Sequence, residues 1–148
     1  MLISTKGRYG LRAMVDLAIN STGEHVALNS IAERQNISAN YLEQMFSLLK
    51  KAGLVKSIKG SQGGYILAHK PASITVGSVL RALEGDLATV DESDIKRTPN
   101  NSIEYCLTIN VWDKLNESIN QVVDSITLED MIDEYKKQNI NLSLMAYI

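Results

Sequence analysis

The strongest constraint on the fold is a glycine-rich, basic segment that directly follows a helical pattern. Residues 55–58 and 65–67 have the character of two short β-strands. Between them lies a tip that is rich in glycine and begins at Lys59 and Gly60, which favours a tight reversal of the chain. A basic hairpin behind a pair of helices predicts a mainly α fold, the winged helix-turn-helix with a two-stranded β-hairpin wing.

Three helices are predicted before the hairpin. The first covers about residues 4–20, has a broad apolar face and ends before Gly23. The second covers about 28–35 and is followed by a tight turn. Ser38 is a good N-cap for the third, which runs to about residue 52, because its hydroxyl can accept a hydrogen bond from a free backbone N–H. The second and third helices therefore form the predicted helix-turn-helix.

Behind the hairpin, the pattern divides into a connecting part and a long helix. Thr75 can cap a short helix that ends at Gly85, and residues 86–101 are polar and without helical period, which indicates a loop. We therefore expect a DNA-binding domain over 1–70, a connecting helix and effector or sensor loop over 71–101, and a dimerisation helix with a C-terminal tail over 102–148.

The dimerisation helix is predicted from an apolar residue at every fourth position. Such a pattern gives about 24 residues of amphipathic helix up to residue 126. The residues expected to pair two subunits are Ile103, Leu107, Val111, Leu115, Ile119 and Val123. The alternative is an intramolecular bundle with the helix at 75–84. A capping box at 127–130 predicts a further short helix, and an apolar tail follows at 142–148.

Composition excludes several classes of protein. An apolar fraction of 45% is that of a globular protein, and no apolar run approaches the length of about 20 residues that spans a bilayer. The first residues lack the apolar core of a secretion signal, so we expect no membrane partner. The single cysteine, Cys106, excludes an internal disulfide, and a cytoplasmic location is the simplest expectation.

The net charge of −2 conceals an asymmetry between the two parts of the chain. Residues 1–70 hold nine Lys and Arg against four acids, whereas 71–148 hold six against thirteen. A basic module on an acidic protein favours binding to a polyanion such as double-stranded DNA. Chance segregation of solvated charges is the alternative.

The N-terminal residues of the second helix in a helix-turn-helix meet base edges in the major groove. Here these are Ser38, Asn40, Tyr41, Glu43 and Gln44, whose side chains could pair with bases or reach phosphate, although they equally suit an exposed helix face. The basic side chains near the start of the first helix and in the hairpin are candidate phosphate contacts, and the candidates in these two regions are Lys6, Arg8, Arg12, Lys56, Lys59 and the backbone at Gly60.

Several motifs in the same order resemble those of the dimeric bacterial regulators that include IscR, NsrR and CymR. The likeness continues as far as Trp112 and 126–128, and its main motifs are Ser4-Thr5-Lys6-Gly7-Arg8-Tyr9-Gly10, Tyr41-Leu42-Glu43-Gln44, Ala52-Gly53-Leu54-Val55 and Lys59-Gly60-Ser61-Gln62-Gly63-Gly64-Tyr65. The resemblance implies a homodimer that binds a palindromic operator, with base-reading residues at 38–44. The wing position that is usually arginine in this family is Lys59 here, which implies weaker reading of a narrow minor groove.

The loop before the long helix departs from the cluster-binding members of that family. They place three cysteines there, whereas this chain has Cys106 alone, with acids that include Asp91, Glu92 and Asp94. Because iron–sulfur clusters need several thiolate ligands, we expect no conventional cluster. Cys106 could be redox-active near a helix N-terminus or an inert cysteine.

The resemblance implies a transcriptional regulator, most simply a repressor, of cysteine and sulfur metabolism or of iron–sulfur assembly. The cysteine-metabolism branch lacks the cysteine triad and has a similar apolar-Tyr-Ile tail. The signal could be a small-molecule effector, a partner protein or thiol oxidation. The alternative function is a protein-interaction module that docks a metabolic enzyme without binding DNA. No enzyme is expected, because no nucleophile–base pair stands out and His25 and His69 are isolated from other metal ligands.

Overall fold

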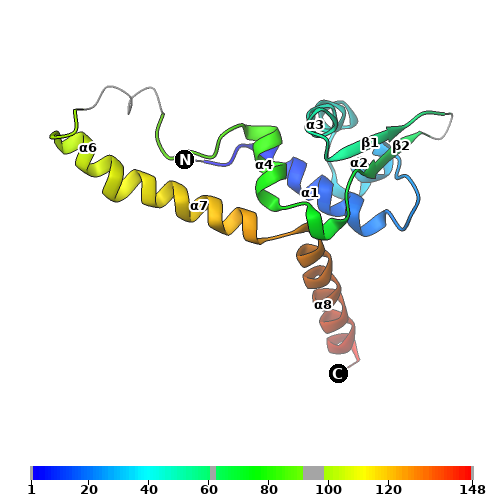
Figure 1. The fold of residues 1–148 in the computed structure, drawn as a ribbon. Coiled ribbons are helices and arrows are strands. Elements are labelled where there is room, and N and C mark those ends of the chain that lie inside the picture. Colours follow the sequence, from blue (N-terminus) through cyan, green and yellow to red (C-terminus); the bar gives the residue numbers. More distant parts are fainter. Residues whose placement is uncertain (1, 61–62, 92–98, 148) are drawn as a thin grey trace.

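The computed structural model describes residues 2–60, 63–91 and 99–147 (Figure 1). The tip residues 61 and 62 and the expected loop acids Glu92 and Asp94 lie outside this part. The elements in chain order are α1 (Thr5–Asn20), α2 (Leu28–Gln35), α3 (Ala39–Lys51), β1 (Val55–Ile58), β2 (Gly64–Leu67), a 3-10 turn (Pro71–Ser73), α4 (Val76–Glu84), α6 (Ile103–Leu107), a π-helical turn (Thr108–Trp112), α7 (Asp113–Ser125) and α8 (Leu128–Ala146).

The helix-turn-helix forms as predicted, and local chemistry explains its boundaries. Ser4 and Ser38 cap α1 and α3, since their hydroxyls accept hydrogen bonds from the N–H groups of Gly7 and Tyr41. Asn36 ends α2 in the left-handed region, with φ of 54°, which turns the chain toward α3. The predicted spans of the first three helices are confirmed to within one residue.

The wing is an antiparallel hairpin with Val55 opposite Leu67 and Ile58 opposite Gly64. A third segment pairs with β2, because the N–H and C=O of Val26 each form a hydrogen bond of 2.9 Å with the backbone of Tyr65. A Cβ at position 64 would overlap the carbonyl of Val26, so glycine is needed for this close approach. The hairpin was predicted from the sequence, but its pairing with Val26 was not.

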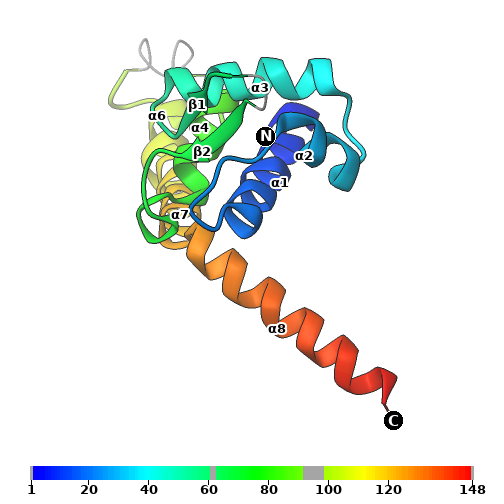
Figure 2. The same ribbon diagram turned by 90° about the vertical axis from the view of Figure 1, so that its right-hand side faces the viewer.

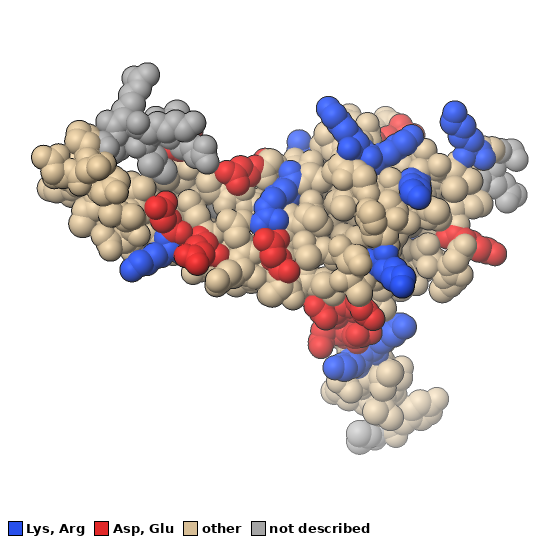
Figure 3. Space-filling model, in the orientation of Figure 1, with Lys and Arg blue, Asp and Glu red and all other residues tan. Residues whose placement is uncertain are grey.

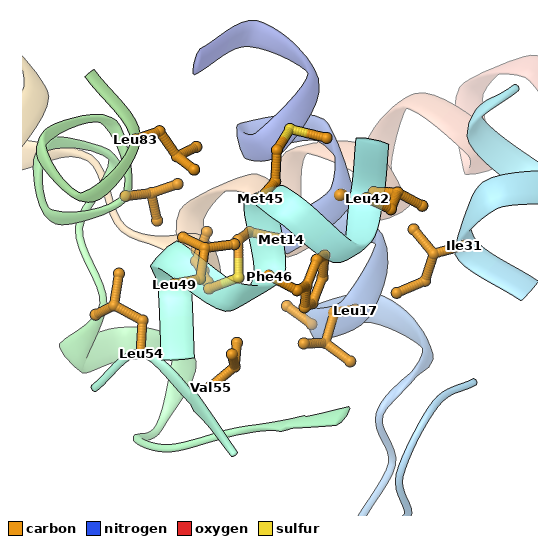
Figure 4. Packing of buried hydrophobic residues seen from close by; sticks show 14 of the residues in the cluster. Met14, Leu17, Ile31, Leu42, Met45, Phe46, Leu49, Leu54, Val55 and Leu83 are labelled. Carbon is orange, nitrogen blue, oxygen red and sulfur yellow. The ribbon is translucent and has the colours of Figure 1, made fainter. Parts of the chain in front are cut away.

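One continuous core holds the helix-turn-helix and the wing together (Figure 4). Phe46, Met14 and Leu17 are fully buried at its centre, where α1, α3 and the wing meet. Helix α4 contributes Val79 and Leu83 to the same core. The expected division at residue 70 stays a prediction, and the core crosses it.

The long helix expected over 103–126 exists, but it contains a π-helical turn. Its α6, Thr108–Trp112 and α7 segments have continuous right-handed helical backbone and extend away from the core (Figure 1). Four residues advance an α-helix by about 40° more than one turn, so a strict four-residue stripe drifts around it. The wider π turn offsets part of that drift in the middle of the stripe.

The prediction of a short last helix was wrong. The capping box between Thr127 and Asp130 is present, but α8 continues for 19 residues and leaves the body of the molecule (Figure 2). No glycine or proline interrupts residues 128–146, so nothing in the sequence stops the helix once it has begun. Its start is anchored, because Leu128 is fully buried and its N–H bonds to the Ile74 carbonyl at 2.9 Å.

Candidate nucleic-acid interface

The N-terminal half of α3 presents a polar surface to solvent. Asn40, Glu43 and Gln44 are exposed and line a shallow hollow together with Ser47 and Leu48. The buried side of the same helix carries Leu42, Met45, Phe46 and Leu49. The core therefore fixes the rotation of α3 and leaves the predicted base-reading side chains facing outward.

Two of the predicted base-reading residues also hold the local structure. Ser38 is exposed, but its hydroxyl already accepts the Tyr41 N–H at 3.2 Å. The Tyr41 side chain is half-buried, with its ring edge-on to Tyr9 of α1 at 6.3 Å between centroids. This pair places the first turns of α1 beside the N-terminus of α3.

The Arg12 side chain, a candidate phosphate contact, makes contacts with other residues of the protein. Its guanidinium lies over the Tyr9 ring, 4.9 Å from the centroid, and donates a hydrogen bond to the Gln35 carbonyl at the end of α2. Arg12 therefore ties α1 to the turn of the helix-turn-helix. The other two basic residues of this region differ from it, because Arg8 is exposed and donates only to the Thr5 hydroxyl at 3.3 Å, while Lys6 is half-buried.

On the wing, Lys56, Lys59 and Gly60 are all exposed. The wing is held against α3 by the rings of Phe46 and Tyr65, whose centroids lie 4.9 Å apart. Lys50 at the end of α3 adds a hydrogen bond of 2.8 Å to the Ser57 hydroxyl. Basic side chains gather over α3 and the wing, whereas acids gather over α7 and the start of α8 (Figure 3).

A buried carboxylate that the sequence analysis missed fixes α1 against α2. Asp16 is only 4% exposed and accepts hydrogen bonds from Arg34 at 2.7 and 3.0 Å and from Gln35 at 2.8 Å. The hydrogen bonds to Asp16 raise the pKa of Arg34 above its ordinary value. An acid inside the apolar run from Met14 to Ile19 was the available signal.

A second missed residue is Glu84, at the end of α4. Its Oε1 accepts hydrogen bonds from the backbone N–H groups of Ser4 and Gly7, both at 3.0 Å, and from the Ser4 hydroxyl. The contact joins residues about 80 positions apart, so no local pattern could have predicted it.

The stripe expected to pair two subunits divides into two parts. Ile119 and Val123 are half-buried and pack against Val76, Leu80 and Leu87 of the same chain, as in the intramolecular alternative. The other end differs, because Ile103, Leu107 and Leu115 are 81%, 44% and 45% exposed, while Val111 is half-buried.

Polar contacts reinforce the packed end of this helix. Arg81 of α4 donates to Asp124 at 2.7 and 3.0 Å and to Asn120 at 2.6 Å. The Thr89 N–H and hydroxyl both donate to Asn116. These bonds fix α7 to α4 and to the start of the loop. The hydrogen bonds from Arg81 also hold the pKa of Asp124 below its ordinary value.

Cys106 is the candidate sensor residue of the sequence analysis. Cys106 is exposed on α6, with the Asn110 amide nitrogen 3.6 Å from its sulfur. It is the only cysteine of the chain, and the described residues contain no group of three or more His, Cys, Asp or Glu side chains placed to hold a metal ion. A cluster requires several thiolates on one site.

Comparison with known proteins identifies the family to which the chain belongs. The family model described as Rrf2, iron-dependent transcriptional regulator, matches residues 3–134. This chain belongs to the Rrf2 family. The transcriptional regulator CymR of Bacillus subtilis is 43% identical over 135 residues, which are 88% of this chain and 89% of CymR.

Solved Rrf2 structures share the fold. The structure of CymR, the global cysteine regulator of B. subtilis, has a TM-score of 0.76 at 40% identity and covers 90% of this chain and 98% of its own. IscR of T. potens has a TM-score of 0.75 at 46% identity and covers 93% of this chain and 90% of its own. The winged helix-turn-helix prediction is confirmed.

Membership in the Rrf2 family settles the broad function. The relatives are named transcriptional regulators, so this chain is a DNA-binding regulator and not an enzyme. Within residues 2–60, 63–91 and 99–147, no helix has the length and apolar character needed to cross a membrane.

Proposed function

We propose that this Rrf2 protein acts as a cytoplasmic homodimer that binds a roughly palindromic operator and represses transcription. Two copies of α3 would enter successive major grooves about 34 Å apart. The observation that carries the proposal is the exposed polar end of α3, which lies between the basic first turn of α1 and the basic wing.

The proposed contacts divide into two kinds. Asn40, Glu43 and Gln44 are exposed on one helix face and have the donors and acceptors that read base edges, with Ser38 and Tyr41 at its start. The second kind would neutralise phosphates, without regard to sequence, through Lys6, Arg8, Lys56, Lys59 and the Gly60 backbone.

The proposed dimer uses the exposed end of the long helix. Ile103, Leu107 and Leu115 present apolar surface to water, which a monomer rarely tolerates over a contiguous area. Val111 lies between them, while Ile119 and Val123 would support the interface from their packed positions. Pairing two copies would remove this surface from water and set the separation of the two α3 helices.

The proposed target genes serve cysteine and sulfur metabolism or iron–sulfur assembly. CymR is described as a global cysteine regulator, and IscR is another regulator whose fold matches. The single Cys106 supports a signal other than a conventional cluster. A small-molecule effector, a metabolic enzyme as partner or oxidation of Cys106 would provide it.

The test of base reading is a pair of substitutions that separate specific from general binding. Glu43→Ala should cost about 1–3 kcal/mol on the operator, relax discrimination between sequences and leave salt-sensitive binding intact, because it removes a base contact. Lys59→Ala should weaken binding to all sequences and reduce the salt slope by about 1. Gel-shift titrations on operator and scrambled DNA measure both effects.

Unchanged affinity of both variants for both DNAs would contradict the proposed interface. Ser47→Ala, one turn further along the same face of α3, is a matched control that removes a hydroxyl at the edge of the same hollow. Recovering bound DNA from cells and mapping it across the genome would then identify the operator and the target genes.

A further inference from the structure

At one of the contacts between α4 and α1, two glycines of α1 leave room for side chains of α4. On α1, a Cβ at Gly7 would overlap Glu84, and a Cβ at Gly10 would overlap Leu83. These two glycines lie on one face of α1, so they admit the last turn of α4 against the first turns of α1. The approach brings a carboxylate to the N-terminus of the helix that carries Lys6 and Arg8.

A single carboxylate oxygen fixes this first turn. Three donors at the start of α1 converge on Oε1 of Glu84: the N–H of its N-cap Ser4 and the N–H of Gly7, at 3.0 Å each, and the Ser4 hydroxyl. The Ser4 hydroxyl accepts the Gly7 N–H only at 3.4 Å. Glu84 is therefore the principal acceptor for the Gly7 N–H, and Gly7 lies between Lys6 and Arg8 in the chain.

The other side of α4 is fixed just as firmly. Arg81, one turn before Glu84, binds Asp124 and Asn120 of α7. A Cβ at Gly77 would overlap the Asp124 carboxylate, so α7 also approaches α4 closely. Helix α4 thus connects the long helix to the first turn of α1 through two oppositely charged side chains.

We propose that Glu84 is a positioning residue for DNA binding, which holds the first turn of α1 so that Lys6 and Arg8 reach the phosphate backbone. The inference rests on the proposed phosphate contacts of these two residues. It makes the position of α4 a determinant of DNA affinity, since any shift of α4 relative to α1 withdraws the acceptor from three donors at once.

The direction in which Glu84→Ala changes DNA affinity separates a positioning role from electrostatic repulsion of the phosphates. Removing a negative charge beside a DNA-binding surface should strengthen binding, because the protein then repels phosphate less. The proposal requires the opposite for Glu84→Ala, namely binding about tenfold weaker on both operator and random DNA, with a salt slope reduced by about 1–2. Glu84→Gln keeps an acceptor oxygen in place and should restore affinity to within about threefold of the parent.

Two controls separate positioning from charge and from folding. Asp86→Ala removes the same charge from an exposed residue just past α4 and should leave binding unchanged or slightly tighter. Circular dichroism establishes that each variant is folded before it is titrated. If Glu84→Ala does not fold, Ser4→Ala removes one of the three donors and should weaken binding about twofold to threefold in the same way.

The decisive experiment is a double-mutant cycle on the full chain with random duplex DNA. Glu84→Ala in the Lys6→Ala, Arg8→Ala background should cause little further loss, because the contacts that it positions are already gone. In the Lys59→Ala background, the fold-loss of affinity caused by Glu84→Ala should multiply the loss caused by Lys59→Ala, because the two sites act independently. Multiplied losses in both backgrounds, or tighter binding by Glu84→Ala alone, would overturn the inference about Glu84. No loss from Lys6→Ala, Arg8→Ala would instead refute the phosphate contacts themselves.

Discussion

The two ends of this chain differ in how much of their apolar surface they bury. Among the described residues, thirteen large hydrophobic side chains are exposed, and eleven of them lie after residue 100. The DNA-binding part exposes only Leu2 and Ile58, and its core contains fully buried side chains from three helices and the wing. Beyond residue 100, Leu128 is the one described large hydrophobic residue that is fully buried.

This contrast shows which part of the fold one chain completes by itself. The helix-turn-helix, wing and α4 enclose a core to which α8 contributes Leu128, whereas most of the long helix and the rest of α8 extend from it with their apolar side chains largely exposed (Figures 1 and 2). A second subunit can supply the missing cover. The difference therefore separates residues that maintain the DNA-binding fold from residues that we propose to maintain the dimer.

The largest expected effect on stability comes from comparing a leucine-to-alanine substitution in the core with one on the exposed end of the long helix. Leu49→Ala in the core should lower the free energy of unfolding by about 3 kcal/mol, because it leaves a cavity around a fully buried site. Leu115→Ala should cost less than about 1 kcal/mol in dilute protein, where subunits are separate, and more as concentration rises. Urea denaturation at several protein concentrations measures both. Equal costs that do not depend on concentration would contradict the contrast.

A smaller effect should come from the polar contact between α1 and α2. Asp16→Ala should lower the free energy of unfolding by about 2 kcal/mol, because Arg34 and Gln35 lose their acceptor in a part-buried site. Asp133→Ala, an exposed acid of α8, is the matched control and should be nearly neutral. Thermal unfolding by circular dichroism compares the two. Similar losses would show that Asp16 is not a structural anchor.

The smallest effect should come from the exposed pair between α4 and α7. Because Arg81 lowers the folded-state pKa of Asp124, the pair stabilises the fold above the unfolded pKa of about 3.9, and this contribution is lost as the pH falls through the folded value. Asp124→Asn should therefore lower stability slightly at pH 7, because an exposed pair contributes little, and should flatten the dependence of stability on pH below about 4 by the same small amount. Denaturation series from pH 2 to 7 measure this. A variant with the same acid dependence as the parent would show that the pair contributes nothing.

The sequence predicted what depends on local spacing and missed what depends on distant contacts. The three helices, the wing and the cap at Thr75 followed from apolar periodicity, capping residues and glycines, and all are present. Asp16 and Glu84 were missed because their partners lie 18 and about 80 residues away. The length of α8 was missed because an apolar tail gives no sign of where a helix ends.

The stripe on the long helix shows a further limit of sequence patterns. A four-residue repeat predicts which side chains share a helix face, but it does not tell which neighbour covers that face. Val123 packs against α4 of its own chain, whereas Leu107, on the same repeat, has no such cover. Contacts with α4, which is distant from this part of the chain in sequence, distinguish the two outcomes.

The most direct test is to select DNA sequences that the full chain binds from a random pool, and then to footprint the chain on them. A homodimer that reads bases with α3 should enrich two inverted half-sites whose centres lie about one helical turn, roughly 34 Å, apart. Both half-sites should be protected together at all protein concentrations that give binding. Enrichment of a single half-site, or of no sequence at all, would contradict the account.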